Sequence, residues 1–347
     1  MKGILLVNLG SPDSPTPTDV KRYLGQFLMD ERVIDIPFIF RWLLVKGIIV
    51  NTRAKKSAAA YQKIWTKEGS PLVVISQKMV DRLQEKIDCP IALGMRYGSP
   101  SIADGLKALD QQGVDEVLMI PLYPQFAMST TETVIEQAKE DLRQFENMTM
   151  EVLPAFYNDE SYLSVISEQM KSEQEDDVYD HFLFSYHGLP ERHIKKSDIT
   201  QSHCKIDASC CVTPSPAHEF CYRHQAYKST EEIASRLGLK EGTYSTSFQS
   251  RLGRDPWLQP YTDETLVKLA QEGKKNIKVV APSFVADCLE TLEEMDMENR
   301  EVFMESGGEK YQFISCLNTY PGWIDVLRKW SDDWKEEKGE KEYLKIK

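Results

Sequence analysis

The sequence lacks the excess of basic residues that a nucleic-acid-binding protein needs. Its 347 residues include 54 Asp and Glu against 42 Lys and Arg, which gives a formal net charge of -12 at pH 7. Binding to a phosphate backbone requires clustered Lys and Arg. Nucleic acid is therefore excluded as a partner, whereas a metal cation or a neutral small molecule is compatible with this charge.

Long apolar runs are also missing. The most apolar window, residues 36–50, is interrupted by Arg41 and Lys46 and is too short to span a bilayer. It could form a core helix with two solvated charges, lie against a membrane surface or line an apolar mouth. Residues 1–8 are followed at once by a Gly-Ser-Pro turn without a small-residue cleavage pattern. We therefore expect a first strand instead of a signal peptide, and a cytoplasmic protein.

Nucleotide-binding motifs are absent as well. Neither the glycine spacing of a dinucleotide fingerprint nor the Lys-Ser/Thr pair of a P-loop follows any predicted strand. The sequence therefore predicts a mechanism without a nucleotide.

What the sequence does contain is an internal duplication. The segments LLVNLG (5–10), GMRYGSP (94–100), LKALDQQG (106–113) and VLMIP (117–121) are echoed by FLFSYHG (182–188), QSRLGRDP (249–256), LVKLAQEG (266–273) and VVAP (279–282). Apolar strand-like runs alternate with amphipathic segments in both halves, which is typical of parallel α/β architecture. We predict two similar Rossmann-like domains, each a parallel four-stranded sheet flanked by helices.

Ligands of open α/β sheets bind beyond the carboxyl ends of the strands. His187 directly follows a predicted strand there, and histidine suits both proton transfer near neutral pH and metal binding. The acid-rich residues 286–298 follow another strand. On a helix, Glu290, Glu294 and Glu298 would stack along one face, either as a solvated face or as a line of hard oxygen ligands for a divalent cation.

Several motifs, taken together and in order, resemble the ferrochelatase family. They are MRY (95–97), YPQF (123–126), FSYHGLP (184–190), SFQSRLGRDPWL (247–258) and FVADCLETLEE (284–294). The similarity extends from about residue 3 to about residue 330.

The resemblance implies an enzyme, a metal chelatase of the lyase class. It would insert Fe2+ into protoporphyrin IX with release of two protons, as the terminal step of haem biosynthesis. His187 and Glu290 match the family's catalytic histidine and glutamate, and Glu294 and Glu298 match its acidic path for the Fe2+ substrate. The porphyrin cleft would lie between the two domains and would be lined by Arg96, Tyr123, Ser129, Trp257 and Phe284.

Four of the seven cysteines fall within the short segment 203–221: Cys204, Cys210, Cys211 and Cys221. Four cysteines so close together, without an export signal, indicate thiolates that bind a metal. Zinc, an iron-sulfur cluster and free thiols all stay open, although the adjacent Cys210 and Cys211 do not form the usual zinc knuckle. Because some bacterial ferrochelatases carry one, the resemblance favours a 2Fe-2S cluster on these cysteines. His203, His218 and His224 lie nearby as substitute ligands.

These observations predict a domain over residues 1–160 with the apolar lip at 36–50, a domain over 161–330 with the cysteine insert at 203–221, and a charged, solvated tail over 331–347. The lip offers a peripheral contact with the inner face of the membrane. Two alternative enzymes are a coproporphyrin III ferrochelatase and a cobalt chelatase. A porphyrin or iron carrier is the alternative without catalysis, and the oligomeric state is not encoded in any recognisable pattern.

Overall fold

The computed structural model describes residues 1–173, 178–251, 253, 255–338 and 341–346. The chain divides into two compact units. The first comprises Met1–Tyr123, Met128–Ala155 and Pro321–Lys347, and the second comprises Pro124–Ala127 and Phe156–Tyr320. Both units are α/β structures with parallel strands, which confirms the predicted fold class. The prediction of four parallel strands in each sheet is wrong for the first unit, whose 5-stranded sheet includes the antiparallel C-terminal strand.

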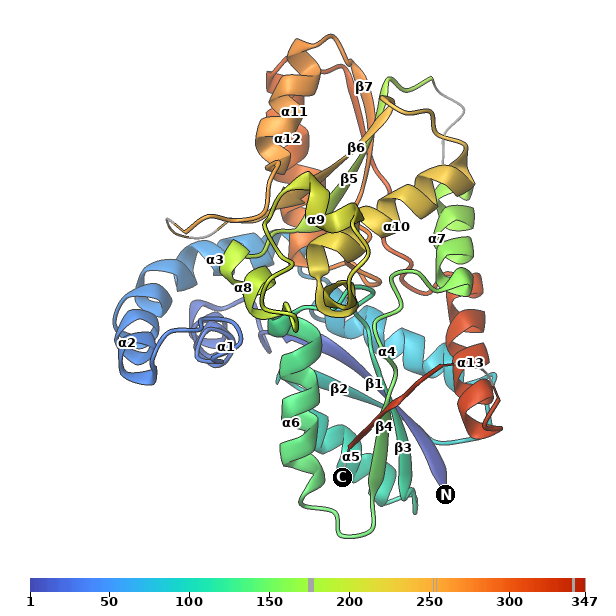
Figure 1. Cartoon of the computed structure of the whole chain (residues 1–347). Helices are drawn as coiled ribbons and strands as arrows, with labels where there is room; N and C mark the ends of the chain where they lie inside the picture. Colours follow the sequence, from blue (N-terminus) through green and yellow to red (C-terminus); the bar gives the residue numbers. More distant parts are fainter. Residues whose placement is uncertain (174–177, 252, 254, 339–340, 347) are drawn as a thin grey trace. The chain divides into compact units, whose positions relative to one another are not determined.

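The first unit is built on a sheet with strand order β2-β1-β3-β4-β9, in which only β9 runs antiparallel to its neighbour (Figure 1). The strands are β1 (Lys2–Ser11), β2 (Ile91–Gly98), β3 (Glu116–Pro121), β4 (Thr149–Val152) and β9 (Leu344–Ile346). The helices are α1 (Pro17–Phe27), α2 (Phe38–Trp42), α3 (Val50–Ile64), α4 (Pro71–Gln84), α5 (Ile102–Asp110), α6 (Thr133–Leu142) and α13 (Pro321–Lys335), with π-helical stretches η1 (Leu43–Ile49) and η2 (Met128–Glu132).

Local sequence explains where several of these elements begin and end. Helix α5 starts with a capping box, in which the Ser101 hydroxyl accepts from the Asp104 N–H and the Asp104 carboxylate accepts from the Ser101 N–H. Strand β1 passes so close to β2 that a Cβ on Gly10 would lie 1.7 Å from the Tyr97 carbonyl oxygen, and Gly10 has a φ of +107°. Only glycine fits this position.

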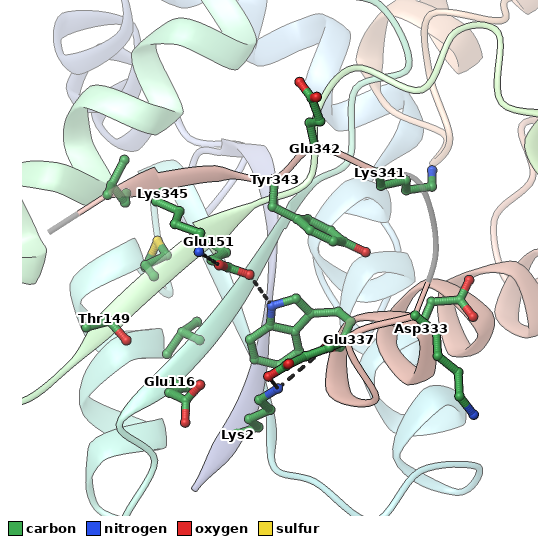
Figure 2. Close-up of a pocket in the computed structure, with 15 residues that line it drawn as sticks. Lys2, Glu116, Thr149, Glu151, Asp333, Glu337, Lys341, Glu342, Tyr343 and Lys345 are labelled. Carbon is green, nitrogen blue, oxygen red and sulfur yellow. Dashed lines mark hydrogen bonds and ion pairs between the residues drawn. The ribbon is translucent and has the colours of Figure 1, made fainter.

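The C-terminal segment differs from the solvated tail predicted for residues 331–347. Trp330 and Trp334 of α13 are buried, and β9 pairs with β4, beside which it crosses in Figure 1. The Glu151 carboxylate of β4 accepts from the Trp334 indole at 2.6 Å and pairs with Lys345 at 3.3 Å. These residues line a pocket of about 850 Å³, in which Glu151 and Lys345 lie side by side (Figure 2). These apolar and polar contacts attach the charged segment to the first unit, so the predicted domain boundary at residue 330 is not where the chain changes units.

The second unit contains a four-stranded parallel sheet of order β6-β5-β7-β8. Its strands are β5 (His181–His187), β6 (Tyr244–Gln249), β7 (Asn276–Val280) and β8 (Lys310–Phe313). Its helices are α7 (Glu160–Ser172), α8 (Glu191–Lys196), α9 (Ala208–Val212), α10 (Tyr222–Leu237), α11 (Thr262–Gln271) and α12 (Asn299–Glu305), with the 3-10 helix η3 (Pro216–Phe220) and the π-helix η4 (Glu290–Glu298).

The predicted duplication is visible in the topology. The order β2-β1-β3-β4 of the first unit corresponds strand for strand to β6-β5-β7-β8 of the second. A π-helix follows the third strand of each copy, η2 after β3 and η4 after β7. Since π-helical turns are rare and concentrate at functional sites, the same place in both copies is where chemistry should be sought.

No helix in the described parts of the chain combines the length and apolar character needed to cross a bilayer.

Candidate active site

His187 stands at the carboxyl end of β5, where neighbouring elements fix its backbone. Its N–H donates to the Ser283 hydroxyl at 3.2 Å, and the Tyr222 hydroxyl donates to its carbonyl at 2.9 Å. The backbone of the following Gly188 passes close to β6. A Cβ at this position would lie 2.7 Å from the Gln249 carbonyl oxygen. The backbone is thus held in place while the imidazole is left out of the sheet's hydrogen bonding.

The His187 imidazole is half-buried and has an unused nitrogen. Nδ1 is buried and has no hydrogen-bond partner among the residues that the structure describes. The ring meets Phe284 edge to face at a centroid distance of 6.3 Å. Burial lowers the pKa of His187, and the nearby charge of Glu290 opposes this shift. A neutral imidazole with a free nitrogen can accept a proton or bind a metal.

The predicted acid ladder lies on the π-helix η4, where the sequence pattern predicted only a helix. Glu290 and Glu294 are half-buried, whereas Glu298 is exposed. Burial and the charges of Glu290 and Glu298 raise the pKa of Glu294 to about 7, although a hydrogen bond from the Ser250 hydroxyl opposes the shift. The carboxyl groups of Glu290 and Glu298 therefore both lie near enough to Glu294 to influence its charge.

Asp287 anchors the start of this helix, a role that the sequence analysis did not assign. Its buried carboxylate accepts from the Asn318 amide at 2.6 Å, the Thr291 hydroxyl at 2.9 Å and the Cys316 N–H at 3.3 Å. Asp287 precedes the ladder by three residues, but its partners Cys316 and Asn318 are far away in the sequence. No local pattern therefore distinguished it from the other acids.

Cys288 adds a second contact that the sequence did not reveal. The thiol is buried and hydrogen-bonded to the Glu290 side chain, and burial together with the charge of Glu290 raises the pKa of Cys288 well above its usual range. A protonated thiol at this place donates to the carboxylate. It is thus a polar neighbour of Glu290 as well as a buried small residue.

The residues predicted to contact a porphyrin fall into two groups. In the first unit, Arg96 lies on β2, Tyr123 follows β3 and Ser129 lies in η2. The Tyr123 hydroxyl is buried without a hydrogen-bond partner in the described part of the chain, and burial raises its pKa well above the usual range. In the second unit, Phe284 lies against His187, and the half-buried Trp257 forms a β-bridge with Pro190. Leu252 and Arg254 of the matching motif lie outside the described residues.

The four cysteines of the insert are all free, three of them buried and Cys204 partly so. Burial and the neighbouring cysteines raise the pKa of Cys204 to about 11 and that of Cys211 to about 12. Two sulfur atoms accept hydrogen bonds: Cys211 from the Arg223 guanidinium at 2.9 Å and Cys221 from the His224 N–H at 3.5 Å.

The three histidines near the insert point to the backbone of the adjacent cysteine pair. His203 and His218 each bond the Cys210 carbonyl, at 2.7 and 2.9 Å, and His224 bonds the Cys211 carbonyl at 2.7 Å. The rings of His218 and His224 stack with centroids 3.6 Å apart. One nitrogen of each ring is thereby occupied by a carbonyl.

A preformed metal site is not evident in this conformation. Across the described ranges, no three His, Cys, Asp or Glu side chains converge closely enough to hold a metal ion. The iron-sulfur cluster therefore stays a prediction, as does binding of iron by the ladder.

Solved structures share this α/β fold. Two solved structures cover nearly the whole chain with a TM-score of 0.52 each: "SirB from Bacillus subtilis with Fe3+", at 12% identity, and the sirohydrochlorin chelatase SirB from Bacillus subtilis subspecies spizizenii in complex with cobalt, at 11%. They cover 96% of this chain and 97% and 95% of their own. At such low identity these similarities concern the fold alone.

Sequence comparison is more specific. The family model described as Ferrochelatase matches residues 1–333. Proteins named ferrochelatase are 46% identical in Opitutus terrae and 48% identical in Ectopseudomonas mendocina, over 94% of this chain and 95% and 96% of theirs. The chain belongs to the ferrochelatase family, as its motifs predicted.

Proposed function

We propose that the protein inserts Fe2+ into protoporphyrin IX, with release of the two pyrrole protons, as the last step of haem synthesis. Family membership supports the reaction. The observation that carries the residue assignment is the free, buried Nδ1 of His187 at a strand end, within the electrostatic influence of Glu290.

His187 and Glu290 would act together at the porphyrin centre. Because its pKa is lowered, the imidazole is neutral near pH 7 and can take a pyrrole proton or ligate the arriving iron. Glu290 would stabilise the imidazolium that results. Glu294 and Glu298 would lead Fe2+ inward, since their carboxyl groups go from half-buried to exposed along one helix.

The porphyrin would be held by the aromatic and polar side chains at the strand ends of both units. A flat macrocycle must bend before a metal can enter, so a surface that fits the bent ring lowers the barrier to insertion. Phe284 and Trp257 offer ring faces, and Tyr123 and Ser129 offer hydroxyl groups. Arg96, also predicted to line the cleft, lies on β2 and donates to Asp30 and Thr133 of its own unit.

The insert is proposed to hold a 2Fe-2S cluster on Cys204, Cys210, Cys211 and Cys221. Hydrogen bonds from N–H groups to the sulfurs and the mutual influence of the buried thiols support this assignment. Such a cluster would stabilise or regulate the insert, because metal insertion itself transfers no electron.

Anaerobic purification followed by visible absorption and by iron, sulfide and zinc analysis tests this cluster. About two iron and two sulfide ions per chain, lost in Cys211→Ser, are expected. Stoichiometric zinc without visible absorption would instead identify a zinc site.

The lip is proposed as a peripheral membrane contact of a cytoplasmic enzyme. Phe38, Ile39 and Phe40 are each more than 60% exposed, at 63%, 62% and 61%. Apolar side chains this exposed fit insertion into a lipid interface. Flotation with vesicles should carry the protein upward and should fail for Phe38→Ser/Phe40→Ser.

Substrate assays separate the remaining alternatives. Anaerobic steady-state assays with protoporphyrin IX or coproporphyrin III, and with Fe2+ or Co2+, should give the highest kcat/KM for protoporphyrin IX with Fe2+. A preference for coproporphyrin III or Co2+ would identify one of the alternative chelatases. Quenching of porphyrin fluorescence without any metalloporphyrin formation would identify a carrier.

A further inference from the structure

A cluster of polar side chains surrounds Asp30 in the first unit. Asp30 Oδ2 accepts from Arg96 Nη2 and from the Thr133 hydroxyl, both at 2.5 Å, and from the Tyr97 hydroxyl at 3.1 Å. Its Oδ1 accepts from the Arg32 N–H at 2.8 Å. One carboxylate thus joins the loop after α1 to β2 and to the first residue of α6.

The ion pair at the centre of this cluster is shielded from solvent. The side chains of Asp30 and Arg96 are only 6% and 15% exposed. Burial alone would raise the pKa of Asp30, but hydrogen bonds from Thr133 and Arg32 and the charge of Arg96 outweigh it, so the pKa is lowered. Removing one charge would leave the other buried without compensation, which is costly.

Arg96 already uses one edge of its guanidinium for contacts within the first unit. Its Nη2 donates to Asp30, and its Nε donates to the carbonyl and hydroxyl oxygens of Thr133 at 3.0 and 2.6 Å. The guanidinium also lies 4.4 Å from the centre of the Tyr97 ring. The Nε–Nη2 edge of the guanidinium, one of the edges that could grip a carboxylate, is therefore already engaged within the protein.

The same loop leads directly into the lip. The Asp30 carbonyl accepts from the N–H groups of Val33 and Ile34 at 3.1 and 3.0 Å. Arg41 of α2 then donates from Nη1 to the carbonyls of Ile34 and Ile36 at 3.1 and 3.0 Å. Side chains of the loop also share an apolar cluster with η1 and α3, made of Leu24, Phe27, Leu28, Met29, Val33, Ile34, Val45, Ile49 and Val50.

We propose that Asp30 is a positioning residue that acts through Arg96: the pair fixes the loop at residues 28–36 and thereby holds the lip at residues 36–50 for porphyrin entry. In this account Arg96 serves the substrate by holding the loop and does not bind a porphyrin carboxylate. The inference rests on the proposed function, because the porphyrin is its substrate.

The test compares Asp30→Asn, Arg96→Met and the double variant with protoporphyrin IX and with its dimethyl ester, which has no carboxylate. The KM for both porphyrins should rise roughly tenfold or more in each single variant, since either leaves a buried charge unpaired. The kcat and the KM for Fe2+ should stay within about twofold, and the double variant should be no worse than the singles.

If Arg96→Met raises the KM for protoporphyrin IX but not for its dimethyl ester, the proposal is overturned, because that result would show that Arg96 binds a porphyrin carboxylate directly. The proposal would also be overturned if the effects of the two single substitutions on the porphyrin KM were additive in the double variant. Glu132→Gln is the matched control, since it weakens the partly exposed pair with Arg32 of the same loop but leaves the buried pair of Asp30 and Arg96 intact. Its KM should match that of the wild type.

Limited trypsin digestion gives a readout that needs no chelatase activity. Cleavage after Lys46 should accelerate in Asp30→Asn while cleavage after Arg236 in α10 stays unchanged. Equal acceleration at both sites, or none after Lys46, would contradict a local effect on the lip. If the wild type makes no haem but the digestion result holds, the proposed function fails and the positioning of the lip stands.

Discussion

The two units share one framework but carry different side chains at corresponding places. Aligning Gly10 with Gly188 puts Leu9 of the first copy opposite His187 of the second. The π-helix after the third strand carries hydroxyl groups at residues 129–131 in the first copy and the acid ladder in the second. We therefore propose that proton and metal chemistry resides in the second copy, whereas the first copy contributes to binding and positioning.

The largest effect is expected at the residues that are unique to the second copy. His187→Ala or Glu290→Gln should lower kcat by about 10²- to 10⁴-fold, the usual contribution of a positioned acid or base. The dissociation constant for porphyrin, from fluorescence quenching, should change little. Full activity in either variant would remove that residue from the chemistry.

Asp287→Asn should weaken the support of the ladder. Replacing a buried acceptor of three hydrogen bonds by an amide is expected to cost about 1–3 kcal/mol. The midpoint temperature of thermal unfolding should therefore fall by several degrees. Asp263→Asn, which removes a partly exposed partner of Arg251, is the control and should leave the midpoint nearly unchanged.

The raised pKa of Glu294 makes stability depend on pH. Between its ordinary value of 4.5 and the folded value of about 7, the folded protein holds a proton that the unfolded chain has released. The contribution of Glu294 to the free energy of unfolding is fully present below pH 4.5 and is lost as the pH rises through about 7. Relative to Glu294→Gln, the wild type should thus lose stability between pH 5 and pH 8 in metal-free buffer. If the melting temperatures of the two proteins change with pH in the same way, the raised pKa of Glu294 is contradicted.

The smallest effects should separate the two π-helices. Glu298→Gln should raise the KM for Fe2+ a few-fold and leave the KM for porphyrin unchanged, because Glu298 is the exposed end of the ladder. Ser129→Ala should do the reverse. Steady-state kinetics with each substrate varied in turn measures the KM for Fe2+ and the KM for porphyrin. If both variants changed the same KM, the proposed difference between the two copies would be contradicted.

Much of the fold was predictable because its signals are local. The apolar strand, the turn and the following helix recur within short segments, so the duplication and the place of His187 could be inferred from sequence. The C-terminal segment was misjudged for the opposite reason. Residues 331–347 are rich in Lys and Glu, and the buried Trp334 donates to Glu151, a partner distant in the sequence.

The site was predictable only in part. The spacing of Glu290, Glu294 and Glu298 indicated a shared face but could not distinguish an α-helix from a π-helix. Asp30 was missed because no local pattern distinguishes it from Glu31 and Asp35 of the same loop. Its main partners, Arg96 and Thr133, follow 66 and 103 residues later. Such long-range polar contacts leave no periodic pattern in a sequence.

The most direct test of the division between the copies is a single-turnover experiment. Enzyme loaded with protoporphyrin IX is mixed anaerobically with Fe2+, and the porphyrin spectrum is followed for wild type, His187→Ala and Ser129→Ala. The account predicts haem formation by the wild type and by Ser129→Ala, and bound but unconverted porphyrin in His187→Ala. Haem formation by His187→Ala at the wild-type rate would contradict it.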